Sequence, residues 1–383
     1  MVEYRGITWD HPRGYRALEA SAIIWEKEGL RIRWDRQPLE GFESSKIDGL
    51  AARYDLIVID HPQVGEAAAV NNCLAPVERW FPQKGLLHVR EKAIGPVLAS
   101  YRYAGQHWAL PLDAATQVMA YRADLLDGGE NNLPRTWTEL CSLAERVPVV
   151  LSLAGPHAVL TFFSFCVAYG EPPLSRPGFI SHETGEAALG LMSFFFQRMG
   201  RGASELNPIG ILDEMSRTNR IALCPLIYGY VNYAAPADPG RRPVQFADAP
   251  ISSTTGRLGS TLGGSGLAVS GQATVSDELV GYITWLLSEQ TQREFIPGFE
   301  GQPSLRPAWT DPGVNLRSNH FYEKTAASVE HAWIRPRYPG YIRFQSEASG
   351  IIRAGLHAGS SPSMILRDLK VSFNRHHPHD QEI

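Results

Sequence analysis

The stretch GITWDHPRG at residues 6–14 is echoed by LIVIDHPQVG at residues 56–65. In both stretches an Asp-His-Pro tripeptide follows an apolar, strand-like run and precedes a segment with helical spacing. Strands that alternate with helices in this way predict an open, largely parallel sheet of the α/β class. Such sheets bind ligands beyond the carboxyl ends of their strands. We therefore expect both tripeptides to lie at one edge of the same sheet, where they form the floor of one binding site.

Length and composition limit the class of protein. A chain of 383 residues favours two domains or lobes over one. The formal net charge is −4 and no basic block is present, which argues against nucleic acid as a partner. No apolar run reaches the ~18–20 residues of a membrane span, so we predict no membrane insertion. The opening MVEYRGITWD lacks the pattern of a secretory signal, which leaves a processed exported protein and a cytoplasmic protein both open.

The periodicity of apolar residues, helix-capping residues and prolines predict the positions of the other helices and strands. We expect strands at 4–8, 30–34, 54–59 and 267–269, and helices at 15–28 and 277–289. The segment LPRTWTELCSLAERV has Thr136 followed three residues later by Glu139, which predicts a capping box at a helix start. The last seventy or so residues read as helices interrupted by prolines.

One long segment resembles a known family. The run GQHWALPLDAATQVMAYRADLL at 105–126, followed by LPRTWTELCSLAERV at 133–147, is similar to the extracellular solute-binding proteins of ABC importers, in their sugar-type, maltose-binding-like class. The matching positions are Gly105, Trp108, Pro111, Asp113, Gln117, Tyr121, Arg122, Asp124, Pro134, Thr136, Trp137, Glu139 and Leu140. The likeness continues in GSTLGGSGLAVS (259–270), ITWLLSEQTQREFI (283–296) and GQPSLRPAW (301–309), so it spans almost the whole chain.

The resemblance implies a two-lobed, periplasmic-binding-protein-like fold of type II, with central mixed sheets and extra C-terminal helices. We expect residues 1–111 plus 265–307 to form lobe I, and residues 112–264 plus 308–383 to form lobe II. Residues 111–113 and 263–264 would be hinge crossings, where glycine tolerates changes in φ and ψ. The family captures a small molecule by closing its lobes and delivers it to an ABC permease. The resemblance thus implies a periplasmic monomer that is no enzyme and has no cofactor.

The two Asp-His-Pro turns supply one wall of the expected cleft. Arg13 can hold a carboxylate or phosphate through two hydrogen bonds, and the helix that begins there presents free N–H groups to an anionic or hydroxyl-rich ligand. The alternative is structural: each Asp caps a helix, each Pro suits the first helical turn, and each His fills a polar turn. Both interpretations can hold at once. The candidate ligand contacts of this wall are Trp9, Asp10, His11, Arg13, Asp60 and His61.

The remaining candidates come from the crossings and from lobe II. Tyrosine faces can stack on a sugar ring, although ordinary core packing is the alternative for them. Asp113 either meets the ligand or fixes the hinge through backbone hydrogen bonds. His157 occupies another strand-end, helix-start position. The full set is Asp113, Gln117, His157, Tyr228, Tyr230, Asn232, Gly264, Ser265, Gln302 and Arg306.

Two other classes compete with a solute-binding protein. The Asp-His pairs could serve a metal-ion-binding protein or a metal-dependent hydrolase. However, the sequence has no H-E-x-x-H, G-x-S-x-G or P-loop signature, so we predict no catalytic residue and no metal ligand. For the solute, the resemblance favours a sugar, glycoside or polyol. The histidines and arginines of the proposed cleft keep a sugar acid or another organic acid open.

Overall fold

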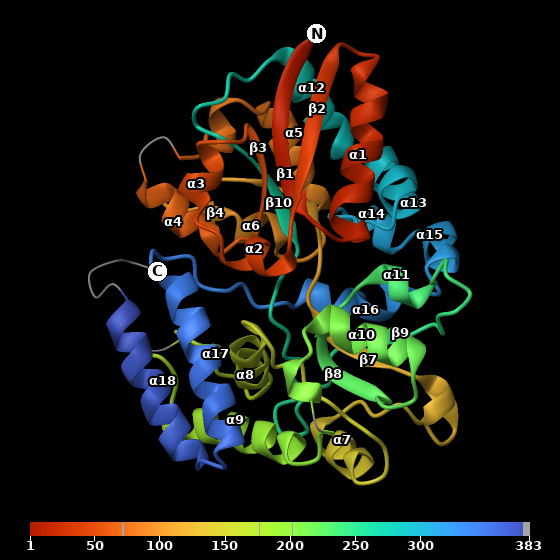
Figure 1. The fold of residues 1–383 in the computed structure, drawn as a ribbon, viewed down its shortest axis with the longest axis vertical. Coiled ribbons are helices and arrows are strands. Elements are labelled where there is room, and N and C mark those ends of the chain that lie inside the picture. Colours follow the sequence, from red (N-terminus) through yellow and green to blue (C-terminus); the bar gives the residue numbers. More distant parts are fainter. Residues whose placement is uncertain (71–72, 176, 201, 378–383) are drawn as a thin grey trace.

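The chain folds into two lobes, which lie one above the other in Figure 1 and are called here the upper and lower lobes. The computed structural model describes residues 1–70, 73–175, 177–200 and 202–377. The upper lobe is built on a five-stranded sheet in the order β2 (Leu30–Gln37), β1 (Val2–Trp9), β3 (Leu56–Ile59), β10 (Ser265–Val269), β6 (Leu110–Asp113). β1 runs parallel to β2 and β3, whereas β10 is antiparallel to β3 and β6, so the sheet is mixed.

Helices cover the upper sheet. In α1 (Pro12–Glu26), Ser21 hydrogen-bonds the Tyr282 hydroxyl of α12 (Asp277–Leu286) at 2.9 Å, which fixes these two helices side by side. The strand β3 is buried along its whole length, as its continuous apolar sequence predicts. The other elements around this sheet are α2 (Leu39–Ser44), α3 (Ile47–Ala51), α4 (Gln63–Ala69), α5 (Gln83–Lys92), α6 (Val97–Ser100), β4 (Arg102–Tyr103), β5 (Gln106–His107), α13 (Ile296–Gly298) and α14 (Arg306–Trp309).

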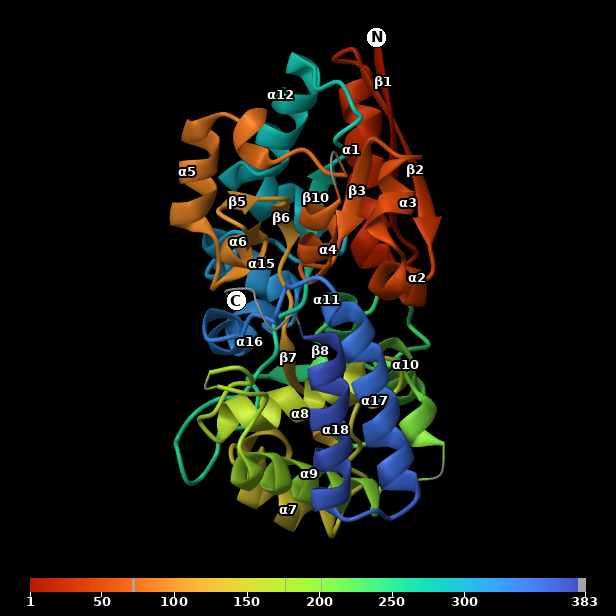
Figure 2. The same cartoon turned by 90° about the vertical axis from the view of Figure 1, so that its left-hand side faces the viewer.

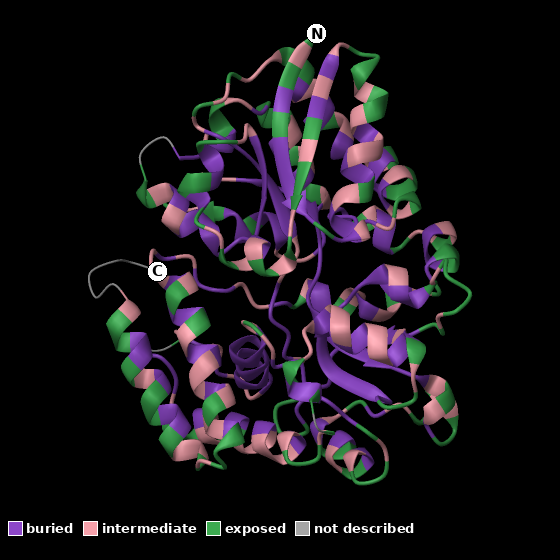
Figure 3. Cartoon of the chain, viewed as in Figure 1, coloured by how far each residue is buried: buried purple, intermediate pink, exposed green. Residues whose placement is uncertain are grey.

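The lower lobe has a smaller, antiparallel sheet in the order β8 (Leu223–Tyr228), β7 (Gln117–Tyr121), β9 (Gln245–Ala247). Its central helix α8 (His157–Ala168) is buried at every residue (Figure 3). The C-terminal pair α17 (Tyr341–His357) and α18 (Pro362–His376) stands alongside α8 and α9 (His182–Phe196), as Figure 2 also shows. The capping box of Thr136 and Glu139 starts α7 (Trp137–Ala144), as predicted. The other helices are α10 (Pro208–Arg217), α11 (Val231–Ala234), α15 (Pro312–Arg317) and α16 (Phe321–Glu330).

Two chain crossings run side by side between the sheets. The Gly263 N–H donates to the Ala115 carbonyl oxygen at 2.9 Å, which joins the segment before β10 to the segment between β6 and β7. Gly264 has a φ of +88°, and a Cβ there would lie 2.5 Å from the Asp113 carbonyl oxygen. Glycine is required at Gly264 because both the backbone angle and the close approach exclude a side chain.

A third connection, residues 331–340, runs between α16 and α17 and is called here the strap. Its Trp333 N–H donates to the Ser260 carbonyl oxygen at 2.8 Å in the lower half. Its Arg337 Nη1 donates to the Ala99 carbonyl oxygen at 2.9 Å in the upper lobe. A Cβ on Gly65 of α4 would overlap the Arg337 carbonyl oxygen, so the strap lies directly on that helix. The strap therefore contacts both lobes.

Candidate functional site

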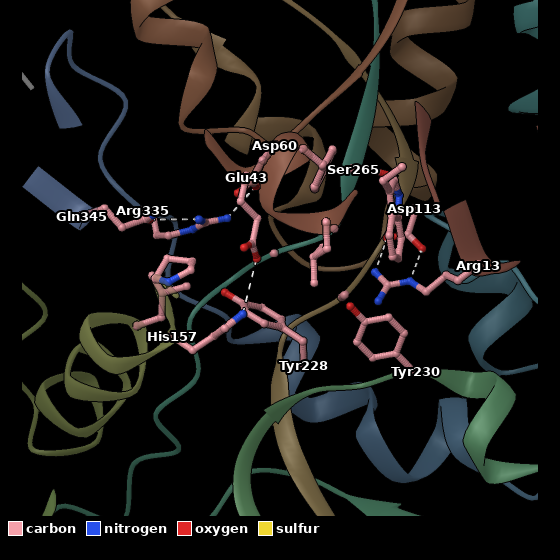
Figure 4. A pocket seen from close by; sticks show the side chains of 18 residues that line it. Arg13, Glu43, Asp60, Asp113, His157, Tyr228, Tyr230, Ser265, Arg335 and Gln345 are labelled. Atoms are coloured by element: carbon pink, nitrogen blue, oxygen red, sulfur yellow. Dashed lines mark hydrogen bonds and ion pairs between the residues drawn. The ribbon is translucent and has the colours of Figure 1, made fainter. Parts of the chain in front are cut away.

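A cavity lies between the two lobes, where the carboxyl ends of β1 and β3 face the start of α8 and the end of β8 (Figure 4). Its volume is about 50 Å³. Because one water molecule needs about 10–15 Å³ of cavity volume, the cavity has room for only a few water-sized groups. Its lining residues are Trp9, Arg13, Leu39, Phe42, Glu43, Asp60, Asp113, Ala115, Pro156, His157, Leu160, Tyr228, Tyr230, Gly263, Gly264, Ser265, Arg335 and Gln345.

Arg13 ties the two lobes together on one side of the cavity. Its Nε and Nη2 donate to the two carboxylate oxygens of Asp113 at 2.8 and 2.5 Å. Its Nη1 donates to the Gly229 carbonyl oxygen in the lower lobe at 3.0 Å. Its guanidinium carbon lies 4.8 Å from the ring centre of Tyr230, a cation–π distance. The positive charge of Arg13 is thus already balanced within the protein.

Asp60 and Arg335 form a second buried ion pair. Asp60 Oδ1 accepts from Arg335 Nη2 at 2.6 Å and from the His61 backbone N–H at 2.9 Å. Arg335 also donates through Nε to the Leu262 carbonyl oxygen and through Nη1 to Gln345 Oε1, at 3.1 and 3.2 Å. Burial by itself would raise the pKa of Asp60, but Arg335 and His61 outweigh it and hold the pKa at about 2. Asp60 is therefore ionised and paired at neutral pH.

Glu43 and His157 face each other across the lobes. Oε1 of Glu43, in α2, lies 3.4 Å from Nε2 of His157, the first residue of α8. Neither ring nitrogen of His157 has a hydrogen-bond partner among the described residues, although the ring is buried. Burial and then the charge of Arg335 lower the pKa of His157 to about 3. Burial and then Asp60 raise the pKa of Glu43 to about 8. Both side chains are consequently uncharged at neutral pH.

Aromatic rings complete the wall beside Arg13. The ring of Trp9 stacks on His11 with centroids 5.2 Å apart, and Tyr230 meets the His11 ring edge-on at 4.8 Å. A Cβ on Gly14 would lie 2.5 Å from Trp9 Nε1, so the glycine after Arg13 lets the indole pack against α1. These rings give the cavity apolar faces next to its charged groups.

The structure brings together most of the residues that the sequence singled out. β1 and β3 are neighbouring parallel strands, so both Asp-His-Pro turns meet at one edge, as predicted. The candidates that line the cavity are Trp9, Arg13, Asp60, Asp113, His157, Tyr228, Tyr230, Gly264 and Ser265. Their positions are those expected of ligand contacts, and their role stays a prediction.

The roles proposed for the Asp-His-Pro residues need correction. The predicted caps are wrong: His11 Nδ1, and not Asp10, accepts the first N–H of α1 from Arg13 at 3.2 Å. Asp10 is exposed and lies 3.4 Å from Arg36. Helix α4 begins at Gln63 without any side-chain cap, so Asp60 does not cap it. His61 does not line the cavity. Its Nε2 accepts the backbone N–H of Arg335, the strap residue whose guanidinium pairs with Asp60.

Four other candidates also lie outside the cavity lining. Gln117 accepts a hydrogen bond from Ser164 at 2.5 Å inside the lower lobe, because the β7 register turns its side chain toward α8. Gln302 joins the crossing to α11, because its Nε2 donates to the Ala114 carbonyl oxygen and its Oε1 accepts the Val231 N–H, both at 3.0 Å. Arg306 forms an ion pair with Glu330 at 2.6 Å. Asn232 lies in α11 and its Oδ1 has no partner among the described residues.

The sequence interpretation missed Glu43, Arg335 and Gln345. A buried aspartate after a strand requires a cationic partner, so the position of Asp60 could have predicted that an arginine or lysine lies beside it. The segment IRPRYPG offers two arginines two residues apart, and its spacing from Asp60 along the chain gives no reason to choose either. Glu43 lies in a short helix whose charged face looks like an ordinary solvated surface.

No group of three or more His, Cys, Asp or Glu side chains that could hold a metal ion is found in the described part of the chain. The same residues contain no helix that is long and apolar enough to cross a membrane.

Comparisons with known proteins agree with the geometry. No protein-family model matches, and no curated protein is found to match. Among solved structures, an ABC transporter solute-binding protein of Agrobacterium radiobacter K84 in complex with ribitol matches with a TM-score of 0.81 and 20% identity, covering 98% of both chains. Maltose-bound MalE3 of T. maritima matches with a TM-score of 0.81 and 17% identity over 98% of this chain and 100% of that chain. A D-mannitol-bound solute-binding protein of Agrobacterium vitis S4 has a TM-score of 0.75 and 15% identity over 97% of both chains.

These likenesses show that the chain has the two-lobed fold of ABC transporter solute-binding proteins, as the sequence resemblance implied. The match covers both lobes and the C-terminal helices, because it extends over nearly the full length of each chain.

Proposed function

We propose that the chain is a solute-binding protein that captures a small, neutral, hydroxyl-rich molecule between its lobes. A sugar or polyol fits the chemistry of the cavity. The ligands named for three proteins of the same fold, ribitol, maltose and D-mannitol, belong to this class. The proposal keeps the lobes expected from the sequence, 1–111 plus 265–307 and 112–264 plus 308–383, except that β6 and α14 extend the upper lobe by two residues at each of these limits. It also keeps the nine predicted residues in the cavity lining as ligand contacts.

The charge balance of the cavity favours a neutral ligand over an organic acid. Arg13 and Arg335 are each paired with a buried aspartate. An anionic ligand would have to displace one of these carboxylates and leave it unpaired, which is costly inside a protein. His157 and Glu43, both neutral at pH 7, add hydrogen-bonding groups without adding charge.

The observation that carries the proposal is the buried imidazole of His157, whose ring nitrogens make no hydrogen bond to a described residue. Buried polar groups in proteins are nearly always hydrogen-bonded, yet neither ring nitrogen of His157 makes a hydrogen bond to a described residue, and the Glu43 carboxyl stays 3.4 Å from Nε2. The ring lines the cavity beside Tyr228, with centroids 5.7 Å apart. One hydroxyl group of a ligand can donate to one ring nitrogen and a second hydroxyl group can accept from the other, so a polyol can satisfy this imidazole.

Capture requires the lobes to separate. A cavity of about 50 Å³ is too small for a hexitol or a disaccharide, since sites for such molecules measure about 300–1,000 Å³. The ligand therefore enters an open form and stabilises the closed form, which alone brings residues of both lobes onto it. The glycines at 263 and 264 lie in the crossing that would act as a hinge.

Calorimetric titration tests the proposal. We expect ribitol, D-mannitol or maltose to bind, and ribonate, the acid of the first, to bind much more weakly. His157→Leu should weaken binding about 3–10-fold, the value of one neutral hydrogen bond. The matched control is His182→Leu, because His182 likewise opens a helix but its side chain is 65% exposed. Equal affinity in both variants, or tighter binding of the acid, would contradict the proposal.

The biological role follows from the same proposal. The chain would deliver its ligand to an ABC permease on the outer side of the membrane, act as a monomer and catalyse no reaction. Binding of the purified chain to vesicles that contain a candidate permease, with and without ligand, tests delivery. Turnover of the bound polyol, detected by mass spectrometry, would contradict a purely binding role.

A further inference from the structure

A second cavity lies on the other side of the strap from the inter-lobe site. Its volume is about 300 Å³, in the range of small-molecule sites. Tyr103 of β4 forms one wall, the loop after α8 at residues 172–175 forms another, and strap residues 333–338 form the third. The cavity is thus bounded by the upper lobe, the lower lobe and the strap. It shares Arg335 with the inter-lobe cavity, but none of the other residues that line the two cavities is common to both.

Arg337 is the chemically distinctive residue of this second cavity. Its Nη1 donates to the carbonyl oxygens of Ala99 and Ser100 at 2.9 and 3.3 Å. Its Nε is buried and has no hydrogen-bond partner among the described residues, and the side-chain hydrogen bonds of Arg337 to described residues are both made by Nη1. Among the residues that the structure describes, no carboxylate pairs with this guanidinium, whereas Arg13 and Arg335 both have one. Burial lowers the pKa of Arg337, as expected for a cation without a counter-charge.

The free edge of Arg337 is the edge that binds carboxylates. Nε and Nη2 of an arginine point in the same direction and match the two oxygens of a carboxylate. Arg13 uses these two atoms to hold Asp113 in this protein. A buried charged N–H without a partner is unfavourable, so the site gains stability when an anion pairs with it.

The other walls favour a flat, apolar body on that anion. The rings of Tyr103, Trp333 and Tyr338 line the cavity together with three prolines. The hydroxyl of Tyr338 is buried and has no hydrogen-bond partner within the described ranges of the chain, so it is available to donate a second hydrogen bond. Aromatic and proline faces pack well against planar rings.

We propose that this cavity, bounded by Tyr103, the 172–175 loop and the strap, binds a small aromatic carboxylate through the Nε–Nη2 edge of Arg337. The proposal does not depend on the function proposed for the inter-lobe cavity. The proposed anion binds in the second cavity beside the strap, whereas the ligand proposed for the charge-balanced cavity between the lobes is neutral.

Calorimetry with benzoate tests this site on the full chain. We expect benzoate to bind with a dissociation constant of about 1 mM or lower, and the neutral isostere benzamide to bind at least about tenfold more weakly. Arg337→Gln should weaken benzoate binding at least about tenfold, while Arg337→Lys should retain part of it. The matched control is Arg343→Gln, because Arg343 is exposed on the neighbouring α17 and should not affect binding.

Two further variants make the outcome decisive. If Arg337→Gln does not fold, Ser175→Glu serves instead, because Ser175 is an exposed residue of the cavity lining and a carboxylate there repels benzoate. His157→Leu should bind benzoate like the unmodified chain, since His157 lies in the other cavity. The proposal is overturned if benzoate does not bind, if benzamide binds equally well, or if His157→Leu and not Arg337→Gln abolishes binding.

Discussion

The ion pair of Asp60 and Arg335 allows a quantitative test of how the inter-lobe cavity is built. We expect Arg335→Met to lower the free energy of unfolding at pH 7 by about 3–5 kcal/mol, because it leaves the buried carboxylate of Asp60 without a counter-charge. Part of this loss can be estimated from Asp60 itself. Its pKa is held at about 2 against an ordinary 3.8, which corresponds to about 2 kcal/mol of stabilisation. The lost hydrogen bonds to Leu262 and Gln345 account for the rest.

Urea unfolding, followed by circular dichroism, measures this loss. The matched control is Arg220→Met, whose partner Glu214 is 2.7 Å away but whose own side chain is 73% exposed, so the loss should be at most about 1 kcal/mol. The Asp60→Asn/Arg335→Met double variant should be more stable than Arg335→Met alone, because neither charge is then left unpaired. The loss caused by Arg335→Met should also shrink at pH 4, where the unpaired carboxylate can take up a proton. A loss no larger than that of Arg220→Met would refute the reasoning.

Two other predictions follow from the same region. Folding raises the pKa of Glu43 from 4.5 to about 8, so between these pH values Glu43 is protonated in the folded chain and ionised in the unfolded chain. The free energy of unfolding, relative to that of Glu43→Gln, should therefore fall by a few kcal/mol at most as the pH rises from 5 to 8. Urea unfolding at both pH values measures this fall. Gly264→Ala should lower the melting temperature more than Gly256→Ala, because both glycines have positive φ but only the Cβ at Gly264 meets a backbone oxygen; equal shifts would contradict a tightly packed crossing.

Local sequence signals predicted much of the upper lobe and the start of one helix in the lower lobe. The apolar runs at 4–8 and 54–59 became β1 and β3, and the capping box of Thr136 marked the start of α7. These features depend on contacts between residues close in the chain or on the burial of a whole segment. The pattern of apolar residues in the sequence indicates both. The meeting of the two Asp-His-Pro turns was predictable for a similar reason, since parallel neighbours end at one edge.

The electrostatics of the cavity could not be predicted in this way. Arg13 was expected to hold a ligand carboxylate, but it is paired with Asp113, a hundred residues away in the chain. Arg335 meets Asp60 across an even longer separation. Only the packed structure decides which buried charges pair, and this pairing is why we propose a neutral sugar or polyol, which the resemblance already favoured, over the organic acid that the arginines and histidines had kept open.

Small-angle X-ray scattering, with and without the best-binding polyol, tests the central claim most directly. Without ligand, we predict a radius of gyration larger than that of the closed structure, because the inter-lobe cavity must open to admit a solute. At saturating ribitol, D-mannitol or maltose, the radius should fall to the value of the closed structure. An unchanged radius upon saturation would contradict capture by closure of the two lobes.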